Sequence, residues 1–509
     1  MLKLSEKFKR FIPFSIVEIG FLIVIAYLLI IRVLLIFSYS TDLEGLEYVS
    51  IHFIQLLKTS HPLYSNPSEF PFLLSVYTPL YHYIMAGCST LLSIDVLNDT
   101  HQLYILTRTV SFLLIFLDFY ILVKILELLV PDFKPSFLFF LLFLLLLPKH
   151  FFTCRPDSFK VTCYLLFLLF NIKYTLTHSN KHFAWGFIFL LLGILFKQDL
   201  IIYGFAYYGI QLLLTKRYKY LLAPILLIIL LGLGVWLTYL FSDINILQNL
   251  LVFNLQYNTG VHLSFIVIVI NIIRLIPLVY FTYINLKSKE RITYTIAIIS
   301  TVYFILSNLS MLRVGSNINY AYESCILLLI NIFLYQKEHI NVRLDKKLAV
   351  YTLFLILFLG KLHLYAYSFD RNNEVTQKRE YYENIASFKA IKRIIKNNVV
   401  FLPNMKYTIF YPDGHLIYGY DWHYERFISI YLNMEIKLKM SKINYHPTME
   451  SKFIVNDMTQ NYDQCFKNGI VKFIVINKDP NSLNQMSKFY PNYKASAVLN
   501  NFLVYQYQP

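Results

Sequence analysis

SFLFFLLFLLLLPKHFFTCRPDSFKVTCYLLFLLFNIK, residues 136–173, consists of two apolar runs separated by a short polar break. Each run is close to the roughly 20 apolar residues that a helix needs to cross the hydrocarbon of a bilayer. The break carries Arg155 and Asp157 on either side of a proline, which stops a helix. We therefore predict two membrane helices joined at one face of the membrane by a charged turn.

The same alternation of apolar runs and short polar breaks extends over most of the chain. Of 509 residues, 57% are hydrophobic and only 15% are charged, and the mean hydropathy is positive. This composition is too apolar for a soluble protein of this size. We predict an all-α polytopic membrane bundle of about eleven spans, near residues 14–38, 104–126, 136–152, 158–175, 184–197, 199–214, 220–241, 263–285, 292–312, 317–335 and 348–368.

The basic residues predict the orientation of this bundle. The formal charge of +16 comes largely from short Lys and Arg clusters on alternate loops, which is typical of cytoplasmic loops and argues against nucleic acid as a partner. The N-terminus is then cytoplasmic, and the chain after the last span is extracytoplasmic. This assignment requires that the apolar stretch 73–94 does not cross the membrane, so we predict a juxtamembrane helix there with Pro79 in its first turn.

The character of the chain changes near residue 369. A charged segment with helical spacing, 376–397, is followed by short β-branched runs between Asn, Asp, Pro and Gly turns. About 140 residues are enough for a small domain with its own core. We predict a transmembrane domain at 1–368 and a small extracytoplasmic α/β domain at 369–509.

Carboxylates gather directly after the first span. Asp42, Glu44 and Glu47 lie in YSTDLEGLEYVSIHF, at the start of the long first outer loop. A carboxylate in this place suits a general base, a metal ligand, or a capping and solvated group.

Cations recur at the outer ends of later spans. Arg108, the pair Arg155 and Asp157, the pair Lys197 and Asp199, and the segment from Arg313 to Glu323 all fall on the predicted outer face. Snorkelling or a local ion pair accounts for each one alone. Together they indicate a face that binds an anion near the membrane surface, such as a lipid-linked phosphate.

The order of these motifs resembles a known superfamily. An acidic D-x-E-G after the first span is followed by HPLYSNP (61–67), YTPLYHY (77–83), TRTVSF (107–112), CRPD (154–157), FKQD (196–199) and RVGSNINYAYE (313–323). This order is similar to that of the GT-C fold membrane glycosyltransferases, which include protein mannosyltransferases, lipid A aminoarabinose transferases and bacterial polyprenyl-phosphate-sugar enzymes. The resemblance covers about 1–368. YTPLY stands where a double proline is usual, and D-L-E-G where adjacent acids are common, so Asp42 and Glu44 both stay candidates for the base.

The resemblance implies transfer of a sugar from a polyprenyl-phosphate donor to an acceptor hydroxyl on the extracytoplasmic face of a plasma or inner membrane. The acceptor is a glycan, a lipid or a protein. Asp42 or Glu44 is the expected base. The expected contacts to the donor phosphate are Arg155, Lys197, Arg313 and Arg108. The expected substrate contacts are Tyr77, Tyr81, His82, Asp157, Asp199, Asn319, Tyr320 and Glu323.

Other interpretations predict different features. A transporter or flippase for lipid-linked saccharides is the main alternative, but such proteins often show internal repeats, and we find none. A polymerase or ligase of another membrane fold would have its catalytic loop late in the bundle. His52, His61 and His82 share the first loop, where a divalent metal with Glu44 or Asp42 is an alternative role, although their spacing matches no ligand motif. No cofactor is predicted with certainty.

Overall fold

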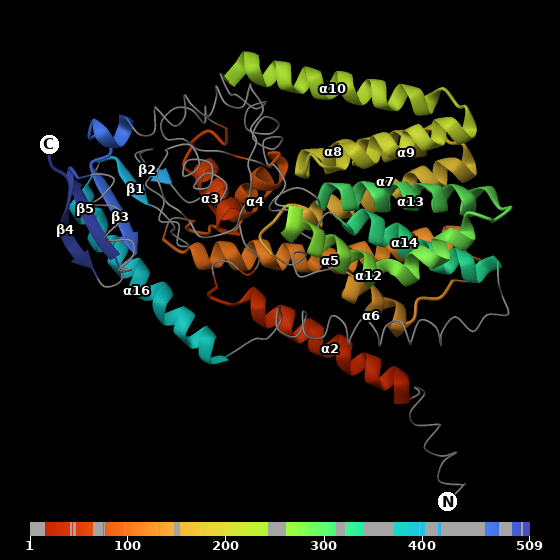
Figure 1. Cartoon of the computed structure of the whole chain (residues 1–509), viewed down its shortest axis with the longest axis horizontal. Helices are drawn as coiled ribbons and strands as arrows, with labels where there is room; N and C mark the ends of the chain where they lie inside the picture. The colour runs from red at the N-terminus through yellow and green to blue at the C-terminus, as the bar shows by residue number, and fades with distance from the viewer. Residues whose placement is uncertain are drawn as a thin grey trace, which may run out of the picture.

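A bundle of helices makes up most of the molecule, and a small sheet lies beyond one end of it (Figure 1). The predicted helical bundle and small C-terminal unit containing strands are confirmed. The computed structural model describes residues 16–40, 43, 47–64, 75, 77–96, 98–131, 133–146, 153–242, 261–311, 321–338, 371–396, 398–402, 416–418, 464–477, 491–499 and 502–509.

Helices occupy ten of the eleven predicted spans, and the last predicted span, 348–368, lies outside the described residues. Three described helical segments are long and apolar enough to cross a membrane, namely Glu18–Ile36, Asp157–Thr177 and Arg291–Met311. The bundle helices are α2 (Ile16–Ile36), α5 (Thr100–Leu129), α6 (Phe137–Leu146), α7 (Asp157–Thr177), α8 (Asn180–Phe196), α9 (Leu200–Thr215), α10 (Lys219–Ser242), α12 (Val261–Asn285), α13 (Arg291–Met311) and α14 (Tyr322–Glu338).

Glycines bring α7 and α8 into close contact. A Cβ added at Gly186 would lie 2.4 Å from the Asn171 side chain of α7, and one at Gly193 would lie 3.2 Å from Cys163 Cβ. The two glycines are seven residues apart, so they lie on one face of α8. Small residues on such a face allow membrane helices to approach closely. This contact fixes the position of the turn that follows α8.

Two buried arginines bind carbonyls in the last described turn of α6. Arg32 of α2 donates to the Leu144 carbonyl at 3.3 Å, and Arg274 of α12 donates to the Leu146 carbonyl at 3.1 Å. The last carbonyls of a helix have no partner within the helix and carry partial negative charge. The two guanidinium groups therefore stabilise an end of α6 that water does not reach.

Two short helices follow α2 in the first loop, α3 (Glu47–Lys58) and α4 (Leu80–Leu91). The predicted helix start at Pro79 is confirmed, since Pro79 is the N-cap residue of α4. With 12 residues, α4 is about 18 Å long, which is shorter than the roughly 30 Å of a bilayer core. It is therefore too short to cross a membrane alone.

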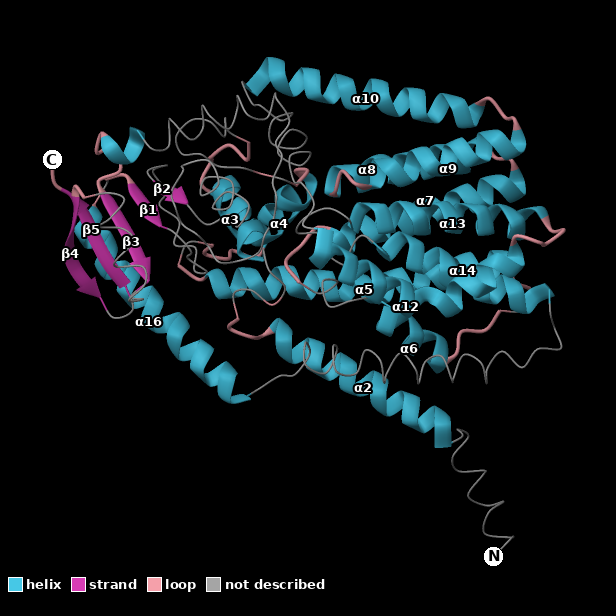
Figure 2. Ribbon diagram, in the orientation of Figure 1, coloured by secondary structure: helices cyan, strands magenta, loops and turns pink. Residues whose placement is uncertain are grey.

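The C-terminal unit consists of a helix and a mixed sheet (Figure 2). The strand order is β2-β1-β3-β5-β4, with β1 parallel to β2 and β3, and β5 antiparallel to β3 and β4. The elements are α16 (Arg371–Ile395), β1 (Val400–Leu402), β2 (Leu416–Tyr418), β3 (Phe473–Asn477), β4 (Tyr493–Leu499) and β5 (Phe502–Tyr507). The sequence predicts α16 from the charged segment and β1, β3 and β5 from the β-branched runs 399–402, 471–476 and 501–507, but it predicts neither β2 nor β4. A further predicted strand, KFIV (452–455), and a predicted helix, SLNQMSKFY (482–490), lie outside the described residues.

Helix α3 is packed on two sides. Val49 and Phe53 belong to an apolar cluster with Phe388 of α16 and residues of β1, β3 and β5. Ile51 and Ile54 belong to a second cluster with residues of α4, α5 and α7. This helix therefore joins the sheet to the end of the bundle, where several of the predicted site residues lie.

Candidate functional site

Glu47, at the start of α3, and Arg108, on α5, form a buried ion pair beside the loop that follows α2. Arg108 Nη2 lies 2.7 Å from Glu47 Oε2, Nε donates to Oε1 at 3.1 Å, and both side chains are fully buried. The backbone N–H groups of Leu43 and Cys154 also donate to this carboxylate, each at 2.8 Å. Burial alone would raise the pKa of Glu47, but the Arg108 charge and these hydrogen bonds hold it below its usual range. The carboxylate is therefore ionised at neutral pH.

The remaining donors of Arg108 hold the backbone of the same loop. Nη1 donates to the carbonyls of Leu35 and Ser38 at 3.3 and 3.0 Å, and Nη2 donates to the Ser40 carbonyl at 2.6 Å. A guanidinium has five N–H groups, and all of them are directed at protein acceptors. Arg108 was predicted to contact the donor phosphate. All of its N–H groups are instead used in hydrogen bonds within the protein.

Six ionisable side chains meet at the end of the bundle adjacent to α4, and we call them the ionic cluster. Formally it holds three cations and three carboxylates. Sequence motifs far apart in the chain supply them, and five of the six were predicted as site residues. Its members are Arg155 before α7, Asp157 and Lys160 on α7, Lys197 and Asp199 between α8 and α9, and Glu323 on α14.

One half of the ionic cluster centres on Asp157. Lys197 Nζ lies 2.7 Å from Asp157 Oδ1, and Arg155 Nε lies 3.8 Å from Asp157 Oδ2. Arg155 also donates to the Tyr77 hydroxyl at 3.2 Å. The Arg155 and Lys197 side chains are 9% and 7% exposed, whereas that of Asp157 is fully buried. All three residues of this half are therefore buried, the two cations slightly less than the carboxylate between them.

The other half centres on Lys160, which the sequence did not single out. Lys160 Nζ lies 2.7 Å from Glu323 Oε1 and 3.0 Å from Asp199 Oδ2. Asp199 is also 3.9 Å from Lys197, which links the two halves. A signal for Lys160 was present, because it follows Asp157 by three residues and so lies on the same face of a helix.

All three carboxylates of the ionic cluster stand at the beginning of a helix. Asp157 is the first residue of α7, Asp199 is the N-cap residue of α9, and Glu323 is in the first turn of α14. The N-terminal end of a helix carries partial positive charge and unpaired N–H groups, which favour anions. The helix ends and the three cations therefore stabilise the three carboxylates, and the formal charges of the ionic cluster cancel.

Tyr81 and His82 of α4 lie inside the protein rather than on its surface. Both side chains are fully buried, and their rings contact each other edge to face at 5.4 Å. Among the described residues, neither the Tyr81 hydroxyl nor either ring nitrogen of His82 has a hydrogen-bond partner. Burial lowers the pKa of His82 to about 3, so the imidazole is neutral at pH 7.

Five predicted site residues lie outside the part of the chain that the structure describes. They are the two candidate bases and three residues of the segment before α14, namely Asp42, Glu44, Arg313, Asn319 and Tyr320. Within the described residues, no group of three or more His, Cys, Asp or Glu side chains is arranged to hold a metal ion.

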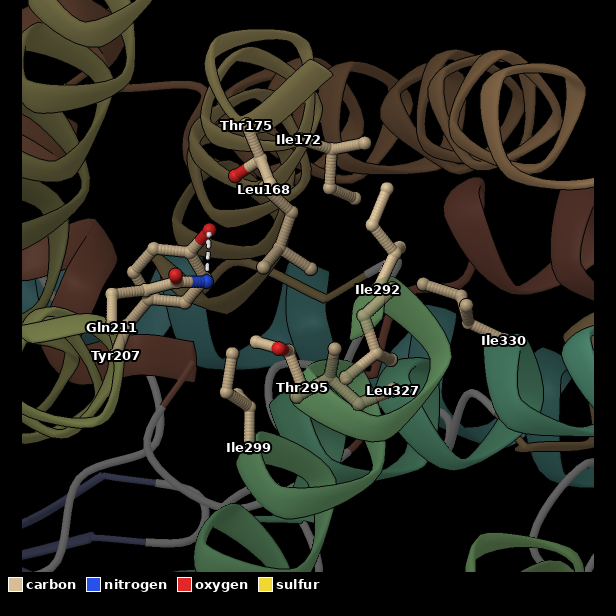
Figure 3. Close-up of a pocket in the computed structure, with 11 residues that line it drawn as sticks. Leu168, Ile172, Thr175, Tyr207, Gln211, Ile292, Thr295, Ile299, Leu327 and Ile330 are labelled. Carbon is tan, nitrogen blue, oxygen red and sulfur yellow. Dashed lines mark hydrogen bonds between the residues drawn. The ribbon is translucent and has the colours of Figure 1, made fainter. Parts of the chain in front are cut away.

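A separate small cavity of about 30 Å³ lies among α7, α9, α13 and α14 (Figure 3). Its lining is mostly Leu and Ile, with Thr175, Tyr207, Gln211 and Thr295 as polar members, and Gln211 donates to the Tyr207 hydroxyl at 3.4 Å. Thr175 is 18 residues beyond Asp157 on α7, about 27 Å along the helix. The cavity therefore belongs to the other half of the bundle from the ionic cluster.

The bundle, the two short helices after α2 and the C-terminal sheet together have the GT-C fold, as the resemblance predicted. A similar solved structure is that of ArnT from Cupriavidus metallidurans bound to undecaprenyl phosphate, with a TM-score of 0.54 and 12% sequence identity over 94% of this chain and 97% of that chain. No protein-family model and no curated protein matches the sequence.

Proposed function

We propose that this chain is an integral-membrane glycosyltransferase that moves a sugar from a polyprenyl-phosphate donor to an acceptor hydroxyl. The ionic cluster carries this proposal, because it places three cations together at one end of an apolar bundle, where the phosphate of a lipid-anchored donor would lie. The fold supports it, since ArnT was solved with undecaprenyl phosphate bound. The acceptor is a glycan, a lipid or a protein.

The chemistry requires a base and an anion site. The carboxylate of Asp42 or Glu44 takes the proton of the acceptor hydroxyl, and the hydroxyl oxygen attacks the anomeric carbon. The bond from that carbon to the phosphate oxygen breaks, and the lipid phosphate leaves with the bonding electrons. Arg155 and Lys197 of the ionic cluster stabilise the negative charge that develops on the phosphate, and Arg313 is a third candidate.

Other residues of the site act through these groups. Tyr77 orients Arg155 through its hydroxyl. Lys160 pairs with both Asp199 and Glu323, and an incoming phosphate competes with Asp157 for Lys197. Arg108 positions the first loop instead of binding the phosphate, because its five N–H groups are all directed at protein acceptors.

The charge distribution supports an extracytoplasmic site. Basic residues lie at the end of the bundle opposite the ionic cluster, where Arg217 contacts His178 and Lys337 pairs with Glu290. Since Lys and Arg favour cytoplasmic loops, this end faces the cytoplasm. The domain at 1–368 then lies in the bilayer, and the domain at 369–509 lies outside. Cysteine labelling from outside at positions 98 and 372 tests this, and failure at either position contradicts the orientation.

The function is tested with purified protein and labelled polyprenyl-phosphate sugars. We expect transfer by the wild type, a large loss in either Asp42→Asn or Glu44→Gln, and a raised KM for the donor in Lys197→Met. Lys289→Met is the matched control, because Lys289 is exposed near the opposite end of the bundle. If both acid variants transfer as well as the wild type, the base is misassigned. A wild type that moves lipid-linked saccharide across vesicles without transfer is a transporter.

A further inference from the structure

Helix α16 of the C-terminal unit binds the segment that follows α2. Glu374 Oε2 accepts a hydrogen bond from Ser38 Oγ at 2.6 Å, and Glu374 Oε1 accepts one from the Tyr39 N–H at 2.7 Å. Both bonds are short and involve a carboxylate, which makes them stronger than bonds between neutral groups. One side chain from a distant part of the sequence thus holds two consecutive residues of the first loop.

Aromatic contacts reinforce this attachment. The Tyr39 ring stacks on His101 of α5 with centroids 3.8 Å apart and lies 5.4 Å from the Tyr381 ring of α16. The Tyr381 hydroxyl accepts from the His101 N–H at 3.1 Å and lies 3.0 Å from Thr100 Oγ1. Helix α16 therefore contacts both the start of the first loop, at Ser38 and Tyr39, and the start of α5.

The contacts of Glu374 lie close to the predicted base. Tyr39 is three residues before Asp42, so their Cα atoms are at most roughly 11 Å apart. Arg108 holds the Ser40 carbonyl and Glu47 holds the Leu43 N–H. The backbone is thus anchored at Ser40 and Leu43, two residues before and one residue after the position of Asp42.

We propose that α16 is a positioning element for the catalytic loop and that Glu374 is its positioning residue, an inference that rests on the proposed function. Arg108 and Glu47 anchor the loop from the bundle side, and Glu374 anchors it from the side of the C-terminal unit. Transfer then depends on a helix that contributes no group to the ionic cluster. A small displacement of a reacting group is enough to slow an enzyme strongly.

The test compares Glu374→Gln with Glu380→Gln in the full-length protein. Glutamine keeps the size of the side chain but has one acceptor oxygen for the two donors. Glu380 lies on the exposed side of the same helix and has the same chemistry. We expect Glu374→Gln to lower kcat at least about tenfold with an unchanged KM for the donor, because the phosphate site is intact. Glu380→Gln keeps the wild-type kcat.

Hydrogen exchange of the segment 38–43 gives a readout that does not require activity. We expect exchange of the Tyr39 amide to speed up roughly tenfold in Glu374→Gln, because its hydrogen-bond acceptor is weakened. If the Tyr39 amide exchanges at the wild-type rate in Glu374→Gln, the proposal is overturned. It is also overturned if this amide exchanges faster but Glu374→Gln has the same kcat as Glu380→Gln.

Two further outcomes are also decisive. If Glu374→Gln does not fold, Ser38→Ala, which removes one of the two hydrogen bonds, must shift exchange and kcat in the same direction, or the proposal fails. If the wild type transfers no sugar, the proposed function fails, and the exchange data alone decide whether α16 orders the loop.

Discussion

Replacing Glu47 by Gln tests the buried ion pair that anchors the first loop. The carboxylate accepts four hydrogen bonds, two from Arg108 and one each from the N–H groups of Leu43 and Cys154. The amide of glutamine has only one acceptor oxygen. Its NH₂ group, which is itself a donor, replaces the second oxygen and faces N–H groups that also donate. Arg108 then keeps a buried positive charge without its counter-ion.

Removing one partner of a buried ion pair costs about 3–5 kcal/mol. We therefore expect the equilibrium constant for unfolding to rise between about a hundredfold and a few thousandfold. The measurement is denaturant unfolding in detergent micelles, followed by circular dichroism. Glu127→Gln is the matched control on α5, because it breaks an exposed pair with Lys124, and such pairs contribute little.

Glu47→Gln is also expected to change how the stability of the protein depends on pH. The pKa of Glu47 in the folded protein lies below its ordinary value of 4.5. The stabilisation by Arg108 is thus complete above about pH 4.5 and is lost as the pH falls through the lowered pKa. Glu47→Gln has no such loss. If the variant unfolds at the same denaturant concentration as Glu127→Gln, and with the pH profile of the wild type, the assignment of Glu47 as an ionised anchor is refuted.

Three further predictions concern other parts of the molecule. Lys160→Met leaves Glu323 and Asp199 without their shared cation, so we expect lower stability and a raised KM for the donor, measured by unfolding and transfer assays. The pKa of His82 near 3 means that the unfolded chain binds more protons between about pH 3 and 6.5, so stability falls as the pH is lowered through this range, and His82→Phe flattens the profile. Gly193→Leu overpacks the contact of α8 and costs about 1–3 kcal/mol, whereas Gly209→Leu, with nothing within 4 Å of an added Cβ, does not.

Much of the bundle could be predicted from the sequence, because membrane helices leave long apolar runs. The ionic cluster could be predicted in part for the same reason. Arg155, Asp157, Lys197 and Asp199 interrupt apolar runs, and the alternation of basic loops places them on one face. Lys160 was not predicted as a site residue, because it lies within a predominantly apolar helical segment and its partner Glu323 is far away in the sequence.

Contacts between segments that are far apart in the chain could not be predicted, because they produce no pattern in the local sequence. Glu374 meets Ser38 across 336 positions, and Arg274 meets the Leu146 carbonyl across 128. Strand β4 was missed for a different reason. It lies at the edge of the sheet, and after its first residue its side chains are exposed or half-buried, so it has little of the apolar alternation that identifies a strand.

The two-sided packing of α3 has a consequence for how the protein unfolds. The faces of this helix belong to two apolar cores, one shared with the sheet and one with the bundle. A chain ending before α16 would leave Val49, Phe53 and Leu56 in contact with water. Such a truncation would expose an apolar surface beside the first loop. The C-terminal unit and the first loop therefore form one cooperative unit, and loss of either is expected to melt the other.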